Sequence, residues 1–256
     1  MAMKGLAVIK LGGSVITVKG GVPRPNLVNL RRLLKEIAQA NRPFVLVHGG
    51  GSYGHYAALK YRVGEGKGAS SPAGASRTIF NMVRLNAIVT REMISAGFPT
   101  LAIPPHAFDF VRDLPDIFVE QFQKSISAGF VPVTYGDVVL DQDSGYRIVS
   151  GDYLASRLAV RLGASLLVFG TDVDGVYRSY PPRQRERPIA YLTRKVSFGA
   201  TSSDATGGIA YKAEQALLAA EGGVTTLIVN ASKPGVLRRA LQGRSVRCTR
   251  VSTDGV

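Results

Sequence analysis

Cysteine is almost absent from this 256-residue sequence, which contains Cys248 and no other. One cysteine excludes a disulfide bond within the chain and is typical of proteins from a reducing compartment, so we expect a cytoplasmic protein. Long apolar runs are also missing. No stretch reaches roughly 18 consecutive apolar residues, and the apolar N-terminal stretch is interrupted by Lys10 and two glycines. The sequence therefore predicts neither a membrane-spanning helix nor a secretory signal peptide.

Acidic residues are scarce compared with basic ones, with 18 Asp and Glu against 32 Lys and Arg and a net charge of +14. Such a charge can indicate nucleic-acid binding, because clustered cations release counterions from a phosphate backbone. The basic clusters at 183–187 and 244–250 are short, however, and lack interleaved aromatic residues. No zinc-finger or RNA-binding signature is present either. We therefore expect a solvated basic surface that attracts small anions, and no nucleic-acid partner.

Short apolar runs alternate with amphipathic stretches along the chain. The runs end in glycine or small polar residues, as in LAVIKLGG, FVLVHGGG, LLVFGTDVDG and TTLIVNASKPG. Between them, apolar residues recur at spacings of three and four, which predicts helices over 27–40, 77–96, 153–162 and 211–221. This alternation predicts an α/β fold with a mostly parallel central sheet and helices on both faces. The glycines that follow the strands would then lie where such sheets bind ligands.

The stretch VHGGGSYGH, residues 47–55, contains the pattern G-x-G-x-x-G over 49–54. A dinucleotide site also needs an acidic residue roughly 20 positions further on, and that region reads SSPAGASRT. A glycine-rich loop between a strand and a helix still presents backbone N–H groups and the positive end of the helix. We therefore interpret the stretch as an anion-binding loop.

A second glycine loop, residues 10–14 (KLGGS), follows the first predicted strand, and Lys19 comes shortly after it. Lysine and backbone amides together suit phosphate oxygens. The Walker pattern GxxxxGK[ST] and the HRD and DFG motifs of protein kinases are absent. If ATP binds, it must bind to another architecture.

Five motifs occur together in a fixed order: IKLGGS at 9–14, HGGGSYGH at 48–55, SGD at 150–152, GTDVDGVY at 170–177, and DATGG at 204–208 followed by Lys212. In this combination the chain resembles the amino acid kinase family, and in that family the branch that phosphorylates isopentenyl phosphate. The resemblance extends over nearly the whole chain. It implies one domain over 1–256 with an open αβα sandwich, in which about 1–150 binds the acceptor and about 151–256 binds the nucleotide. It also implies a homodimer.

The resemblance further implies ATP as phosphoryl donor, with Mg²⁺ carried by the ATP phosphates and no metal ligand from the protein. The catalytic residues would be Lys10, Lys19, His55, Asp152 and Lys212. The nucleotide would contact Lys10, Gly12, Gly13, Ser14, Thr171, Asp172, Asp174, Gly175, Tyr177, Gly207, Gly208 and Lys212. Asp152 would hold the two lysines in place, although a Gly-Asp pair before YLASRLAV is also a good helix start.

The acceptor, an isoprenoid monophosphate, would contact Gly49, Gly50, Gly51, Gly54, His55 and Gly151. His55 favours a phosphate acceptor, because histidine can donate a hydrogen bond to a phosphate oxygen in either protonation state. Ile79, Met82 and Val83 lie near one helical face and are candidates to line an apolar pocket, or simply to pack in the core. The segment 62–76 is rich in small residues and suits a flap over this pocket. His48 is interpreted as the end of a strand and His106 as a loop residue.

Two other functions remain open from the sequence. Fosfomycin kinase has a similar arrangement of glycine loop and histidine, so a phosphonate acceptor is the nearest competing enzyme function. A nucleotide-binding regulator without catalysis is the alternative from another class. The presence of Lys10, Asp152 and Lys212 together argues against that alternative.

Overall fold

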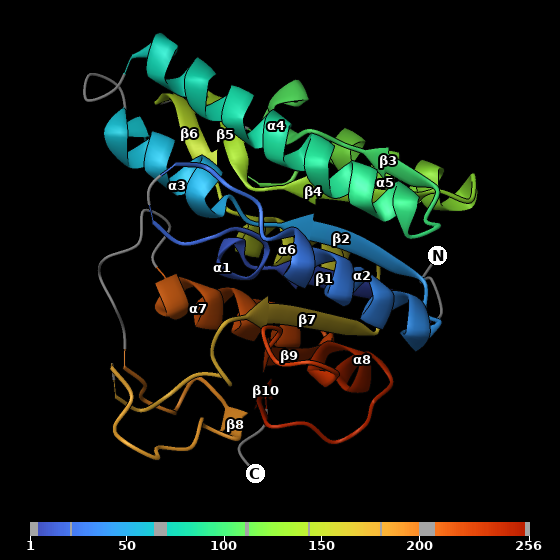
Figure 1. Ribbon diagram of the computed structural model, residues 1–256, viewed down its shortest axis with the longest axis vertical. Helices are drawn as coiled ribbons and strands as arrows, with labels where there is room; N and C mark the ends of the chain where they lie inside the picture. Colours follow the sequence, from blue (N-terminus) through green and yellow to red (C-terminus); the bar gives the residue numbers. More distant parts are fainter. Residues whose placement is uncertain are drawn as a thin grey trace.

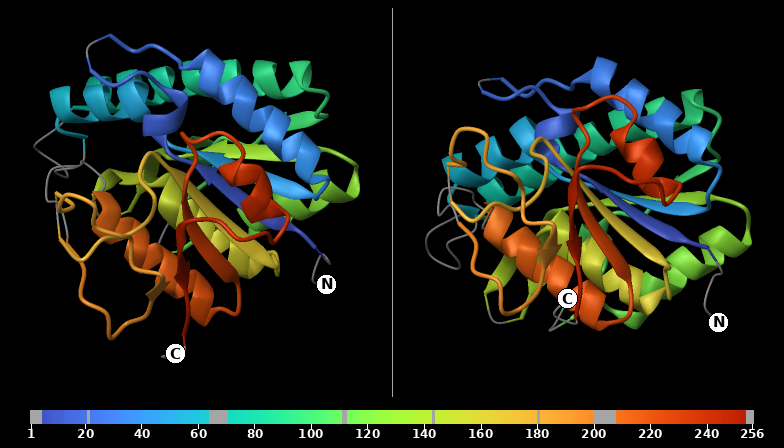
Figure 2. Two further views of the ribbon diagram at one scale, coloured as in Figure 1. Left: turned by 60° about the horizontal axis from the view of Figure 1, so that its bottom comes forward. Right: turned by 90° about the horizontal axis from the view of Figure 1, so that it is seen from below.

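An eight-stranded sheet between two layers of helices forms the framework of the protein (Figures 1 and 2). The computed structural model describes residues 5–20, 22–63, 71–110, 113–142, 144–179, 181–199 and 208–253. Its strands are β1 (Ala7–Leu11), β2 (Phe44–His48), β3 (Thr100–Ala102), β4 (Val131–Tyr135), β5 (Asp137–Asp141), β6 (Gly145–Val149), β7 (Leu166–Thr171), β8 (Tyr191–Leu192), β9 (Thr225–Asn230) and β10 (Cys248–Val251). The predicted α/β sandwich is confirmed.

The order of the strands places β1 near the middle of the sheet. The order is β3-β4-β2-β1-β7-β9-β10-β8, and β1 pairs in parallel with both β2 and β7. β10 runs antiparallel to β9, while β5 and β6 form a separate antiparallel hairpin. Because β1, β2, β7 and β9 are parallel, their carboxyl ends lie at one edge, where the glycine loops follow.

The helices include all four predicted stretches, of which 27–40 has its predicted start and the other three begin two to five residues earlier than their apolar spacing suggests. They are α1 (Gly13–Ile16), α2 (Leu27–Ala40), α3 (Gly51–Lys60), α4 (Pro72–Ser95), α5 (Asp116–Ser127), α6 (Gly151–Arg161), α7 (Gly208–Glu221), α8 (Val236–Leu241) and the 3₁₀ helix η2 (Pro105–Ala107). The side chain of Asn26 caps α2, that of Ser71 caps α4, and that of Ser150 caps α6. Within the described ranges no helix is long and apolar enough to cross a membrane.

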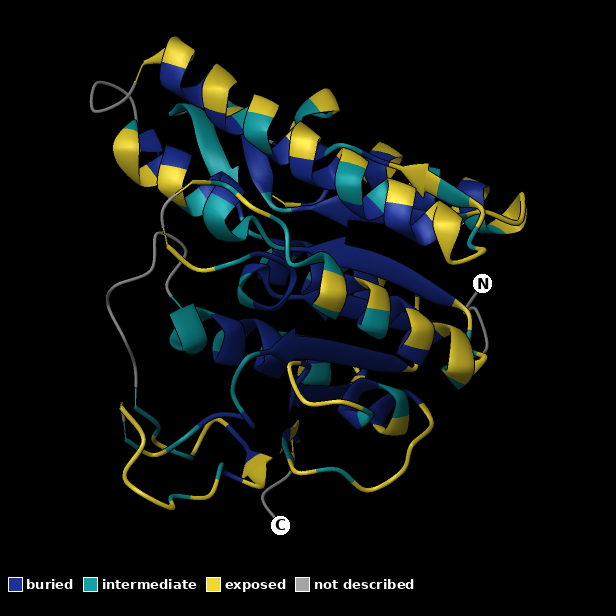
Figure 3. Cartoon of the chain, in the orientation of Figure 1, coloured by how far each residue is buried: buried dark blue, intermediate teal, exposed yellow. Residues whose placement is uncertain are grey.

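The central strands β1, β2 and β7 bury both of their faces, and alternate residues pack against different helix layers (Figure 3). In β1, Val8 packs with α5, α6 and α7, whereas Ile9 packs with α1, α2, α4 and α8. Lys10 therefore points to the same layer as Val8. That layer contains α6 and α7, which carry the other two residues of the predicted phosphate-binding cluster.

Candidate active site

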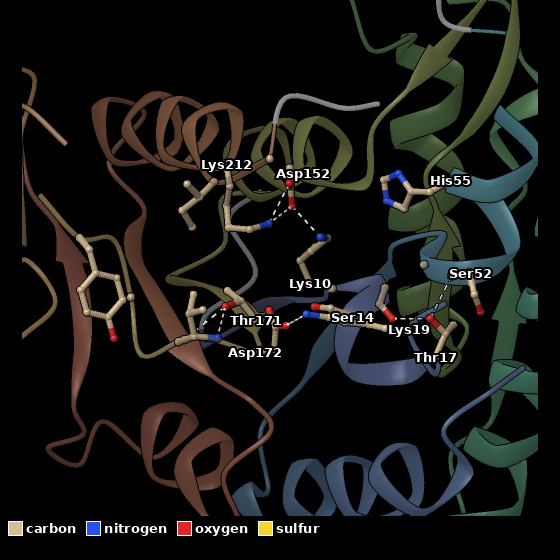
Figure 4. A pocket seen from close by; sticks show the side chains of 18 of the residues that line it. Lys10, Ser14, Thr17, Lys19, Ser52, His55, Asp152, Thr171, Asp172 and Lys212 are labelled. Carbon is tan, nitrogen blue, oxygen red and sulfur yellow. Dashed lines mark hydrogen bonds and ion pairs between the residues drawn. The ribbon is translucent and has the colours of Figure 1, made fainter. Parts of the chain in front are cut away.

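Lys10, Asp152 and Lys212 meet in space at the carboxyl end of the sheet (Figure 4). Lys10 Nζ lies 2.8 Å from Asp152 Oδ1, and Lys212 Nζ lies 2.8 Å from both carboxylate oxygens. The three side chains come from β1, from the first turn of α6 and from α7. Ser150, not Asp152, caps α6, so the Asp152 carboxylate is available to bind both ammonium groups.

Lys10, Asp152 and Lys212 are 6%, 7% and 8% exposed. Their charges therefore interact strongly, because little water screens them. Burial alone would raise the pKa of Asp152, but the two lysines hold that pKa well below its usual range. Burial lowers the pKa of Lys212 to about 8, and Asp152 only partly opposes this effect. Lys212 Nζ also lies 5.3 Å from the centre of the Phe169 ring, a further contact that favours the cation. The cluster carries two positive charges against one negative charge and so attracts anions.

The two glycine loops touch backbone to backbone beside this cluster. Gly49 N donates to Leu11 O at 2.9 Å, and Gly12 N donates to Gly170 O at 2.8 Å. A Cβ on Gly13 would come within 2.1 Å of Gly51 N, so no side chain fits at this contact. Gly51 also has φ +48°, which favours glycine. The glycines thus permit close approach of the two loops, and the N–H groups of Gly12 and Gly49 are bonded to backbone carbonyls of the sheet.

A large cavity of about 590 Å³ opens over the first glycine loop and extends towards the C-terminal part of the sheet. Lys19 reaches this cavity and forms an ion pair with Asp172 at 2.6 Å. Burial acts to raise the pKa of Asp172, yet the hydrogen bond from Lys19 keeps that pKa below its usual value. Most of the predicted nucleotide-binding residues line this cavity: Lys10, Gly12, Gly13, Ser14, Thr171, Asp172, Gly175, Tyr177, Gly208 and Lys212.

A smaller cavity of about 80 Å³ adjoins the large one on the other side of Lys10 and Asp152. Its lining includes predicted acceptor-binding residues, namely Gly49, Gly50, Gly54, His55 and Gly151. The lining also includes the apolar residues Ala58, Met82, Val138 and Ile148. Lys10, Gly13, His55 and Asp152 line both cavities, so a ligand in one would meet a ligand in the other at this point.

Several predicted site residues lie elsewhere. Val83 is 40% exposed on the outer face of α4, and Ile79 packs beside Val63 and Ala75, so neither lines the small cavity. The inward face of α4 instead presents Thr78 and Met82, one helical turn apart. Gly51 lines the large cavity only. The spacing identified an amphipathic helix but could not identify which residues face the pocket.

Asp174, a predicted nucleotide-binding residue, does not line either cavity. Its carboxylate accepts hydrogen bonds from Asn230 Nδ2 at 2.9 Å and from Lys233 Nζ at 2.6 Å, and it lies 3.3 Å from Arg247 Nε. Burial would raise its pKa, but Lys233 and Asn230 keep that pKa below its usual value. Asp174 thus links segments at the ends of β7, β9 and β10, and its predicted contact with the nucleotide stays a prediction.

Two predictions fall partly outside the described residues. Gly207 is one of them, so its predicted contact with the nucleotide stays a prediction. Of the segment expected to form a flap, residues 64–70 lie outside, whereas Pro72 and the residues after it form the first turn of α4. The part from Pro72 onward is therefore helix and not loop, because Ser71 caps the helix and proline is favourable in its first turn.

The three histidines have different surroundings. His55 lies on α3 and lines both cavities. His48 ends β2, where burial lowers its pKa to about 4 and its ring contacts Asn86 Oδ1 at 3.2 Å. His106 is more than a loop residue, because its Nδ1 lies 2.6 Å from Oδ2 of the buried Asp137, which raises the pKa of His106. Only His55 is placed to touch a ligand in these cavities.

Sequence reasoning missed many of the residues that line the cavities, and four examples show why. Thr17 lies in the large one, and Thr78, Val138 and Ile148 lie in the small one. A signal existed for Thr17, which follows Gly13 by one helical turn. Val138 and Ile148 belong to the β5–β6 hairpin, and nothing in their local sequence distinguishes them from core residues.

Comparison with known proteins identifies the family. A model described as the amino acid kinase family matches residues 5–230. The chain belongs to this family. Its amino acid kinase relatives include the isopentenyl phosphate kinase of Methanothermobacter thermautotrophicus, which is 34% identical over 263 residues, covering 96% of this chain and 99% of that protein.

A second relative and a solved structure extend the comparison. The isopentenyl phosphate kinase of Arabidopsis thaliana is 34% identical over 227 residues, covering 78% of this chain and 68% of the plant protein. A solved structure described as "X-ray structures of isopentenyl phosphate kinase" is 34% identical and has a TM-score of 0.83, covering 96% of this chain and 100% of that one. The predicted family and fold are thus confirmed over nearly the full chain.

Proposed function

We propose that this protein is an isopentenyl phosphate kinase, which transfers the γ-phosphoryl group of ATP to isopentenyl phosphate and releases isopentenyl diphosphate and ADP for isoprenoid biosynthesis. The observation that carries the proposal is the pair of adjoining cavities that meet at Lys10, His55 and Asp152. One is large enough for a nucleotide. The other is small and is lined by both polar and apolar residues, as a short isoprenoid phosphate requires. Relatives with this activity in their names match over nearly the whole chain.

The chemistry requires the two phosphates to approach despite their charges. An oxygen of the acceptor phosphate attacks the γ-phosphorus of ATP while the bond to the β,γ-bridging oxygen breaks and ADP leaves. The acceptor oxygen is already ionised near neutral pH, so no strong general base is needed, and catalysis consists of alignment and charge stabilisation. Lys10 and Lys212 would neutralise the transferring group from two sides, and Asp152 holds both lysines in place.

Mg²⁺ would enter with ATP, bound to its phosphate oxygens. In the described parts of the chain, no three side chains of the metal-binding types gather into a possible ion site. Asp172 presents a carboxylate to the large cavity, but it is paired with Lys19. These residues fit a metal held by the nucleotide, which would supply additional positive charge to the phosphates.

A coupled assay of ADP release tests the proposed function. The donor is ATP with Mg²⁺, and the acceptors are isopentenyl phosphate, dimethylallyl phosphate, fosfomycin, UMP, acetylglutamate and carbamate. We expect turnover only with the isoprenoid monophosphates. Turnover with fosfomycin alone would favour a phosphonate kinase of the same fold. No turnover with any acceptor would favour a nucleotide-binding regulator.

We expect the His55→Ala variant to raise KM for isopentenyl phosphate by about tenfold or more, because a hydrogen bond to a charged group contributes about 1.5–3 kcal/mol. The affinity for ATP should stay nearly unchanged, since the small cavity holds the acceptor. Initial-rate kinetics and calorimetric titration with ATP measure the two effects. His55→Gln is the matched control, because it keeps an N–H donor and should retain part of the acceptor affinity. A collapse of ATP affinity in His55→Ala would instead place His55 at the nucleotide.

We also propose a cytoplasmic homodimer that pairs through the outer face of α4. Phe80, Val83 and Ile94 are 61%, 40% and 57% exposed there, at helical spacings that place them on one side. Exposed apolar side chains on one side of a helix suit a self-complementary contact about a two-fold axis. Within the chain, about 1–150 would bind the acceptor and about 151–256 the nucleotide.

Sedimentation velocity tests the homodimer. The wild-type protein should sediment with twice the 27.3 kDa mass of one chain. The double variant Phe80→Asp, Ile94→Asp should sediment as a monomer, because four carboxylates would be buried at the contact. Ile117→Asp on α5 is the control, since Ile117 is 58% exposed in the opposite helix layer. A monomeric wild type would contradict the proposal.

A further inference from the structure

The hydroxyl of Thr17 joins the two glycine loops by hydrogen bonds in both directions. Its Oγ1 donates to Gly13 O at 2.7 Å and accepts from the backbone N–H of Ser52 at 3.1 Å. Thr17 follows α1 directly and is 3% exposed. Figure 4 shows Thr17 between the loop that carries Ser14 and the helix turn that carries Ser52. One buried hydroxyl therefore connects segments 35 residues apart in the sequence.

The hydrogen bond with Ser52 is a long-range contact, unlike the local hydrogen bonds that a threonine in a helix often forms. Threonine hydroxyls often donate to the carbonyl four residues earlier, and the bond to Gly13 is of that kind. Ser52, however, lies in the first turn of α3, where backbone N–H groups have no partner inside the helix. The N-cap residue of α3 is Gly50, which has no side chain to accept from them. Thr17 supplies the missing acceptor from the opposite loop.

The two glycine loops are in close contact around Thr17, so a larger residue at Gly51 would not fit between them. A Cβ on Gly51 would come within 2.1 Å of Thr17 Oγ1 and 2.7 Å of Gly13 O. The glycines therefore allow the loops to touch, and Thr17 fixes how they touch. Gly13 lines both cavities, while Gly51 lines the nucleotide cavity and its neighbour Gly50 lines the acceptor cavity.

We propose that Thr17 is a positioning residue, which fixes the separation and orientation of the nucleotide loop and the acceptor loop so that the two phosphates align for transfer. The inference rests on the proposed kinase function. In-line transfer is sensitive to such alignment, because a displacement of about 1 Å can lower the rate about 100-fold. Thr17 would act through its hydroxyl, which forms hydrogen bonds with backbone groups of both loops.

The test compares Thr17→Val with Thr17→Ser. Valine keeps the shape of threonine and removes both hydrogen bonds, whereas serine keeps the hydroxyl. We expect Thr17→Val to lower kcat by about 10- to 100-fold and to change the affinity for ATP, measured by calorimetry without acceptor, by less than about threefold. Thr17→Ser should keep kcat within about threefold of the wild type. Circular dichroism and thermal denaturation check that both variants are folded.

Each other outcome overturns the inference in a different way. An unchanged kcat in Thr17→Val would show that the hydroxyl has no role in alignment. A loss of ATP affinity that equals the loss of kcat would assign Thr17 to nucleotide binding alone. If Thr17→Val fails to fold, Thr17→Ala removes the same hydroxyl without adding bulk, and the same criteria apply. A wild-type protein inactive on every acceptor would instead overturn the proposed function, and with it any role of Thr17 in transfer.

Discussion

The Lys212→Met variant should lose at least about a thousandfold in kcat, because single cationic groups that stabilise a transferring phosphoryl contribute about 10³–10⁵ to the rate. Lys212 is one of two ammonium groups within 2.8 Å of Asp152, and the only one that α7 contributes to the cluster. Methionine has a similar length and no charge. Asp152 keeps Lys10 as its partner, so the fold should survive the substitution.

The coupled assay of ADP release with isopentenyl phosphate measures this effect at saturating substrates. Lys195→Met is the matched control, because Lys195 is exposed and lines neither cavity. It should leave kcat unchanged. If Lys212→Met retains the wild-type kcat while it binds ATP normally, the neutralising role assigned to Lys212 is wrong.

The Asp152→Asn variant should lose both activity and stability. Two buried ammonium groups would then face a neutral amide, and loss of one partner of a buried ion pair costs about 3–5 kcal/mol. For a chain of this size, each kcal/mol corresponds to about 2–4 °C in Tm, so the expected decrease in Tm is on the order of 10 °C. The decrease in kcat should be comparable to that of Lys212→Met, because neither lysine is held in place.

Thermal denaturation with and without ATP distinguishes this explanation from general damage to the core. ATP phosphates supply the missing negative charge, so ATP should raise the Tm of Asp152→Asn by more than it raises that of the wild type. Asp113→Asn serves as a control, because the Asp113 side chain is 57% exposed and its ion pair with Arg157 lies at the surface. Surface pairs contribute about 0–1 kcal/mol, so its Tm should change little. An unaltered Tm in Asp152→Asn would contradict the buried-charge account.

The fold was predictable where local pattern and packing agree. The stretch 27–40 is helical over the range that its spacing indicates, because its apolar side packs in the core and Asn26 caps its start. The antiparallel direction of β10 was not predictable, since it depends on pairing with β9 and not on its own four residues. The β5–β6 hairpin was missed for the same reason.

The site residues were likewise only partly predictable from the sequence. The sequence motifs identified Lys10, Asp152 and Lys212, and the structure brings these residues together. Asp174 belongs to one of the same motifs, but Lys233 and Arg247 hold its carboxylate outside the cavities. These partners come from distant loops. The motif could identify the residue type at that position, and only tertiary structure determined which side chains it meets.

The alternation of faces along β1 has a consequence for how the protein tolerates insertions and deletions. Lys10 shares a face with Val8 and points towards α6 and α7, while its neighbours point towards the other layer. A shift of β1 by one position against β2 and β7 would exchange these two sets of side chains. The lysine would then be buried among apolar side chains of α2 and α4, far from its counter-ion. Two requirements therefore fix the register of β1 against its neighbours. One is the packing of its apolar side chains in the core, and the other is the position of the Lys10 charge next to Asp152.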